Sequence, residues 1–404
     1  MLLKIAWRNI WRSRTRSLVV IGAIIVGVWA VISLISFSSG MVTTFINNSI
    51  KNELSHIQVH NPEFLKERGV NFSIEENLSV FEKIKNEPNV LAAAQRSVNT
   101  GMISSAKGAR GLMIVGIDPT EENAVTGLKD NIKEGDYFTL KKRNPILISK
   151  KMAEKLQVKV RQKVVLTFQN RQNDISTGAF RIAGIFSTGN TTFDEFRVYT
   201  RRSDMNRIMG EDNVAHQMAV VLNDPKLLTE TQASIKVANP NLSIQTYKEV
   251  SPEINLFESQ IAISAGIFTF IVMLALIFGI INTMLMAVLE RYRELGMLMS
   301  VGMKKGQIFL MIMLETIMLG MVAAPFGLLF GFVTVKWLSK RGIDLSAYSD
   351  GMNQFGMAEK VYPDLSPEYY GMLAIAVAIT AILASIYPAL KAIRLKPVEA
   401  IRQL

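Results

Sequence analysis

The chain of 404 residues carries 45 Lys and Arg against 34 Asp and Glu, a formal net charge of +11, with three His and no Cys. The lack of cysteine excludes disulfides, thiolate catalysis and cysteine-based metal sites, and three histidines are too few for most metal chemistry, so we expect no metal site. No array of base-stacking aromatic residues accompanies the positive charge. We therefore expect anionic lipid or an acidic protein as partner, and no nucleic acid.

Residues 1–17 predict an amphipathic helix at the cytoplasmic membrane interface. The segment carries Lys and Arg but no acid, and Trp7 and Trp11 share a face with apolar neighbours. Tryptophan at headgroup level is typical of interfacial helices, so both are candidate anchors, although ordinary basic flanking sequence has the same composition. Residues 18–37 then predict the first transmembrane span. A signal peptide is the alternative, but its apolar run is usually only about 7–15 residues long.

Residues 38–258 predict a large extracytoplasmic domain between the first and second spans. A strand, helix and strand pattern near its start (Ser55–Val59, Leu78–Lys85 and a strand from Val90) is repeated near its end (Gln217–Leu222, Lys226–Val237 and a strand from Leu242). Two such units predict a ferredoxin-like, porter-like module split by an inserted β-rich lobe at about residues 116–210. In that lobe we expect Asp194 and Glu195 in a solvated loop.

Three further spans follow, at residues 259–289, 308–335 and 371–390, which makes the fold an α+β membrane protein with four transmembrane helices. Lys and Arg are concentrated in residues 1–17, in the segment 290–307 and in the tail 391–404, whereas the loop 336–370 is acidic overall. The positive-inside rule therefore places both termini in the cytoplasm.

The second span is longer than a bilayer requires. Residues 259–289 contain no charge and make roughly 46 Å of helix, against a hydrocarbon core of about 30 Å, so the excess predicts a stalk. In the third span Glu315 is an intramembrane carboxylate, which we expect to pair with a basic residue of segment 290–307 or of the tail, a proton relay being the alternative. Gly327 and Gly331 predict close helix packing there.

The segment after the second span carries the most specific pattern. It contains a Glu-Arg-x-Arg-Glu-x-Gly sequence, then Val-Gly and a basic pair, and its candidate residues are Glu290, Arg291, Arg293, Glu294, Gly296, Gly302, Lys304 and Lys305. A second pattern, the C-terminal signature, runs from the end of the fourth span into the tail and contains Pro388, Ala389, Arg394, Pro397 and Ala400. Together with the opening Ala-Trp-Arg-Asn-Ile, these patterns resemble the FtsX/MacB superfamily of ABC-transporter permeases (type VII), in which segment 290–307 would contact the ATPase.

Within that superfamily the domain resembles the LolC/LolE-like lipoprotein-releasing branch, through Ser55–Pro62, Val115–Pro119 and Gly135–Phe138. The resemblance implies a dimer, of identical or sister permeases, on two copies of a separate ABC ATPase. The sequence has no Gly-x-x-x-x-Gly-Lys-Ser/Thr loop, so we expect ATP and Mg to be bound by that ATPase, with no cofactor and no catalytic residue in this chain.

The resemblance also implies mechanotransmission by a protein of the cell inner membrane, in which ATP-driven motion crosses that membrane to release a lipoprotein from its outer leaflet. Val26 and Ile271, on the apolar faces of the first two spans, are candidates for a lipid cavity. A periplasmic carrier or outer-membrane factor is a possible further partner, but the hairpin Gln169–Ala179 is short where LolC has an extended hook. Two alternatives stay open: a MacB-like efflux or peptide-resistance permease, which usually has a fused ATPase, and an FtsX-like regulator of cell-wall hydrolases, which usually has a smaller domain.

Overall fold

The computed structural model describes residues 2–67, 69–138, 144–348, 351 and 360–394. The chain divides into two compact units. The helical unit comprises Met1–Met41, Glu258–Ile343 and Val361–Leu404, and the α/β unit comprises Val42–Phe257 and Asp344–Lys360.

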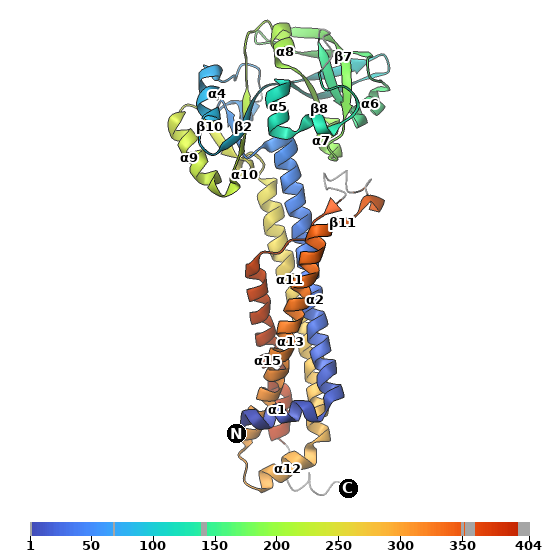
Figure 1. The fold of residues 1–404 in the computed structure, drawn as a ribbon, viewed down its shortest axis with the longest axis vertical. Helices are drawn as coiled ribbons and strands as arrows, with labels where there is room; N and C mark the ends of the chain where they lie inside the picture. Colours follow the sequence, from blue (N-terminus) through green and yellow to red (C-terminus); the bar gives the residue numbers. More distant parts are fainter. Residues whose placement is uncertain (1, 68, 139–143, 349–350, 352–359, 395–404) are drawn as a thin grey trace. The chain divides into compact units, whose positions relative to one another are not determined.

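The helical unit contains four helices that are long and apolar enough to cross a membrane. They are α2 (Arg14–Ser49), α11 (Glu253–Glu290), α13 (Lys305–Arg341) and α15 (Pro367–Ile393). Each extends beyond the apolar stretch that predicts it, and α13 continues through Pro325 as one helix. Two shorter helices, α1 (Leu2–Arg12) and α12 (Tyr292–Ser300), lie near the same end of the bundle (Figure 1).

Apolar side chains from all four long helices, and from α1 and α12, form one core. The predicted close packing of α13 is present: a Cβ built on Gly327 would lie 2.9 Å from Cβ of Val28, and one on Gly331 would lie 2.5 Å from Cδ1 of Ile32. Helix α11 is the most exposed, because only 11% of its most apolar stretch is buried, against 39–44% in the other three. Its remaining apolar surface therefore requires lipid or another chain.

The α/β unit begins with the predicted split module. Its strands are β1 (Ile57–His60), β2 (Val90–Ser105), β9 (Gln217–Leu222) and β10 (Ser243–Thr246). They pair antiparallel in the order β10-β1-β9-β2, so the two halves of the module interleave although more than a hundred residues separate them. Helices α4 (Asn77–Lys85) and α9 (Leu228–Ala238) complete the two β-α-β units.

The sheet continues from β2 into the inserted lobe. Strand β2 pairs with β9 over residues 90–96 and with β3 and β6 farther along its length. The lobe therefore includes the second half of β2 and all of β3, so it begins before residue 116, its predicted start. The lobe's strands are β3 (Gly108–Ile117), β4 (Ile132–Gly135), β5 (Pro145–Ser149), β6 (Lys163–Gln169), β7 (Ile175–Phe186) and β8 (Arg197–Arg201). Its helices are α5 (Pro119–Thr126), α6 (Lys150–Leu156), α7 (Thr191–Glu195) and α8 (Arg202–Met209).

Short elements connect these parts. They are the π-helical turn η1 (Ile50–Leu54) after α2, and α3 (Phe64–Glu67), η2 (Leu128–Asn131), η3 (Pro225–Leu227), α10 (Tyr247–Val250), β11 (Ile343–Asp344), η4 (Ser346–Tyr348) and β12 (Lys360–Val361).

The expectation of a solvated loop at Asp194 is wrong. Asp194 lies in α7, and its side chain is buried. The carboxylate accepts hydrogen bonds from the backbone N–H and the hydroxyl of Thr188 and from the hydroxyl of Ser187. Burial raises the pKa of Asp194 to about 6, although these donors act to lower it.

Candidate functional site

The predicted ATPase-coupling segment forms helix α12 followed by a tight turn into α13. Leu295 and Gly296 face the bundle and are buried. Gly302 has a φ of 102°, a backbone conformation that glycine adopts without steric cost. The side chain of Gln307 accepts a hydrogen bond from the backbone N–H of Lys304 and so caps the start of α13. The segment is thus a folded element with one fixed face.

Ion pairs connect this segment to the N-terminal part of the chain. Arg12 at the end of α1 donates two hydrogen bonds to the Glu294 carboxylate, at 3.0 and 2.5 Å, and Arg16 at the start of α2 pairs with Glu290. Arg291 reaches Glu294 at 3.3 Å. Burial acts to raise the pKa of Glu294, but the bonds from Arg12 and Arg291 outweigh it and the pKa lies below its ordinary value.

Glu315 has the predicted kind of partner. Its carboxylate lies 3.4 Å from Nη1 of Arg291, so the basic residue comes from segment 290–307. The Glu315 side chain is 10% exposed and that of Arg291 is 22% exposed. The pair therefore lies largely out of water and links the residue that begins α12 to α13.

The opposite face of α12, with Val301 just after it, is apolar, and no residue among those that the structure describes covers it. Met297, Leu298 and Val301 are exposed, and Val301 is 84% exposed. Three cations, Arg293, Lys304 and Lys305, are also exposed in the same segment. An apolar face beside cations fits a protein partner with a hydrophobic groove and acidic rim.

Sequence patterns predicted the acidic and basic residues of this segment but not their partners Arg12 and Arg16. The sequence indicates those two cations only as part of the basic flank, because nothing local points to a carboxylate nearly three hundred residues away. A signal did exist in the excess of cations over acids in residues 1–17.

The other predicted residues occupy separate places. Trp7 and Trp11 are exposed on α1, with ring centroids 5.9 Å apart. Val26 on α2 and Ile271 on α11 are both exposed. In the tail signature Pro388 and Ala389 are buried in α15. Arg394 is exposed just after that helix, and Pro397 and Ala400 lie outside the described residues.

Comparison with known families accounts for both units. The profile of the MacB-like periplasmic core domain matches residues 17–238, more than half of the chain, and that of the FtsX-like permease C-terminal region matches residues 266–397. The chain belongs to the FtsX/MacB superfamily of ABC-transporter permeases. The second match includes α12, so the ion-paired segment lies in the region typical of these permeases.

Individual relatives are similar at modest identity. The lipoprotein-releasing system transmembrane protein LolC of Xylella fastidiosa is 23% identical over 344 residues, which are 78% of this chain and 78% of that protein. The macrolide export ATP-binding/permease protein MacB of Mannheimia succiniciproducens is also 23% identical over 344 residues, 79% of this chain and 50% of that protein.

Among solved structures, the periplasmic region of MacB from Actinobacillus actinomycetemcomitans covers 52% of this chain and 97% of its own, with a TM-score of 0.37 and 12% identity. The extracellular domain of the ABC-type transporter YknZ covers 48% of this chain and 100% of its own, with a TM-score of 0.34 and 16% identity.

Proposed function

We propose that this permease transmits ATP-driven motion across the inner membrane and thereby releases lipoproteins from the outer leaflet. The observation that carries the proposal is the similarity to LolC, which extends over most of both chains and includes both units. In this proposal both termini are cytoplasmic and the α/β unit lies outside. A second permease copy, identical or a sister subunit, completes the assembly.

The ATPase in this proposal is a separate subunit that binds ATP and Mg. It docks on the exposed apolar face of α12, at Met297, Leu298 and Val301, with the neighbouring cations at the rim. Displacement of α12 then passes to α13 through the Arg291 and Glu315 pair, whereas the exposed pair of Arg12 and Glu294 couples α12 only weakly to α1. Charge reversal at Arg291 and Arg293 should abolish ATPase stimulation in the co-purified complex.

The lipid anchor would be held by apolar surface on α2 and α11. Val26 and Ile271 are exposed there, and α11 leaves most of its apolar surface uncovered within the chain. Each buried methylene contributes about 0.8 kcal/mol, so such a surface offsets part of the cost of extracting acyl chains from the bilayer. A further proposal is that a periplasmic carrier or outer-membrane factor docks on the α/β unit. The turn between β6 and β7 would offer such a partner little surface, because it comprises only residues 170–174.

Reconstitution tests the function. The complex in proteoliposomes with a triacylated lipoprotein should hydrolyse ATP and transfer lipoprotein to an acceptor, and Val26→Arg or Ile271→Arg should stop release. The matched control is Leu329→Arg on α13, since Leu329 is as exposed as Ile271. If depletion in cells leaves lipoprotein localisation intact but sensitises the cells to peptides or antibiotics, the MacB-like efflux function replaces this one.

The orientation has its own test. A cysteine at Gln172, exposed in the α/β unit, should react with an impermeant thiol reagent in cells whose outer membrane, where present, has been permeabilised. A cysteine at Ser300, at the end of α12, should react only after lysis. The reverse labelling pattern would contradict the proposed topology.

A further inference from the structure

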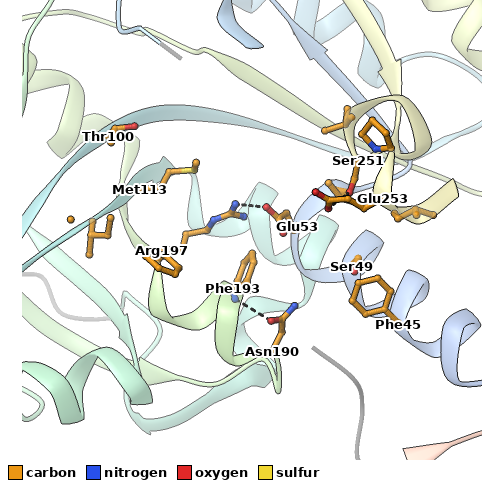
Figure 2. A pocket seen from close by; sticks show the side chains of 17 residues that line it. Phe45, Ser49, Glu53, Thr100, Met113, Asn190, Phe193, Arg197, Ser251 and Glu253 are labelled. Atoms are coloured by element: carbon orange, nitrogen blue, oxygen red, sulfur yellow. Dashed lines mark hydrogen bonds and ion pairs between the residues drawn. The ribbon is translucent and has the colours of Figure 1, made fainter. Parts of the chain in front are cut away.

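A cavity of about 880 Å³ lies within the α/β unit. Three parts of the unit line it: the end of α2 with η1, the segment leading into α11, and the lobe around α7 and β8. Figure 2 shows Glu53, Arg197 and Glu253 extending toward this cavity, one from each part. Its volume is in the range of pockets that hold drug-sized ligands.

Aromatic side chains form much of its apolar lining. Phe45 packs edge to face on Phe257, with ring centroids 5.2 Å apart, which fixes its ring at the cavity wall. Phe193 lies in α7 and is buried. Phe196, which follows α7, is 58% exposed, so its ring is available to an apolar ligand.

The charges in the lining do not balance. The Arg197 guanidinium is 2.5 Å from Oε1 of Glu53 and 4.3 Å from the centroid of the Phe193 ring, so this cation already has an acidic and an aromatic partner. Glu253 accepts a hydrogen bond from the Ser251 hydroxyl at 3.4 Å. In the described part of the chain Glu253 has no salt bridge, which leaves one carboxylate of this lining without a cation.

Glu253 occupies the start of a long helix. It lies in the first turn of α11, where the partial positive charge of the helix N-terminus favours an anion. Its side chain is also exposed to the cavity. A bound cation would therefore meet this carboxylate beside exposed aromatic surface.

We propose that this cavity binds an amphipathic cation, a ligand with an ammonium or guanidinium group on an aromatic or aliphatic body. Glu253 accepts hydrogen bonds from the cationic group, and Phe196 and Phe45 contact the body. An anionic ligand is disfavoured because the Arg197 cation is already paired and two carboxylates line the same space. This binding step depends neither on the cargo of the transporter nor on the direction of transport.

Direct binding to the purified full-length protein in nanodiscs tests the proposal. The small-molecule probes are phenylbutylammonium and its matched anion phenylbutyrate, and the peptide probes are acetylated Phe-Lys-Leu and Phe-Glu-Leu amides, each titrated by ligand-observed NMR. We expect each cation to bind at least tenfold more tightly than its matched anion, a difference of about 1.4 kcal/mol. If phenylbutylammonium binds and the Phe-Lys-Leu peptide does not, the ligand is a small molecule. If only the peptide binds, the ligand is a peptide.

Variants locate the site. Glu253→Gln should remove the preference for the cation, whereas Glu230→Gln should keep it, because Glu230 is an exposed first-turn carboxylate of α9 outside the cavity. Phe196→Ser should weaken cation and anion alike. Equal binding of cation and anion, or the same loss with Glu230→Gln as with Glu253→Gln, would overturn the proposal, as would absence of saturable binding.

Discussion

Replacement of Arg291 by alanine should be far more damaging than replacement of Arg12, although both cations pair with acids in the same region. Glu315 is 10% exposed, so Arg291→Ala would leave a carboxylate largely buried without its cation. Loss of one partner of such a pair costs about 3–5 kcal/mol. Arg12 and Glu294 are 65% and 38% exposed, and a pair of that kind contributes about 0.2–1 kcal/mol.

The double variant Arg291→Met with Glu315→Gln separates the buried charge from the lost contact. Because it removes both charges, it should recover most of the stability lost in Arg291→Ala. The measurements are the thermal denaturation midpoint of the purified permease and the ATPase stimulation of the assembled complex. Similar midpoints for Arg12→Ala and Arg291→Ala, or no recovery in the double variant, would refute the reasoning. Recovery of the midpoint without recovery of stimulation would assign Arg291 a role in coupling beyond folding.

Three more outcomes are expected. Gly331→Ala should destabilise the helical unit by about 1–3 kcal/mol through the clash with α2, measured as a lower denaturation midpoint. Gly22→Ala should not lower the midpoint, because apart from chain neighbours and the backbone of its own helix no described atom lies within 4 Å of the added Cβ. Val301→Asp should prevent co-purification of the ATPase without lowering the denaturation midpoint. The control is Val237→Asp on α9, which should leave both co-purification and midpoint unchanged, since Val237 is 83% exposed and Val301 is 84% exposed. Because the pKa of Asp194 is raised to about 6, the protonated form favours folding, so stability should fall by up to about 3 kcal/mol as pH rises from 4 to 6. The Asp194→Asn variant should lack that pH dependence, and an identical pH profile in both proteins would contradict the raised pKa.

The four long helices were the most predictable part of the fold, because their apolar composition alone determines that they form helices. A long stretch without charge has no stable alternative to a helix in hydrocarbon, so all four spanning helices were predictable. Their ends were not, because polar residues such as Arg14 and Glu253 continue a helix as readily as they begin a loop. The ferredoxin-like pairing was predictable because both halves repeat one local pattern.

Other features depend on contacts that no local pattern specifies. Strand β2 changes partners part-way along its length, from β9 to β3 and β6. The residue at which the partner changes is determined only by the position of the lobe. Asp194 and Glu195 predict a solvated loop because two adjacent acids would face opposite ways in a strand, yet the donors of Ser187 and Thr188 hold Asp194 in the interior. The partners of Arg12 and Arg16 were likewise set by the tertiary structure.

The unequal cost of the ion pairs suggests how motion of α12 would spread if the ATPase displaces it. The exposed pair between Arg12 and Glu294 can exchange its partners for water at a cost of about 1 kcal/mol or less, so α1 can remain in place while α12 moves. The pair between Arg291 and Glu315 is largely buried and costs several times more to break. Displacement of α12 should therefore carry α13 with it before it carries α1. Because Gly327 and Gly331 hold α13 tightly against α2, the same displacement then reaches the first span through close packing and not through charge.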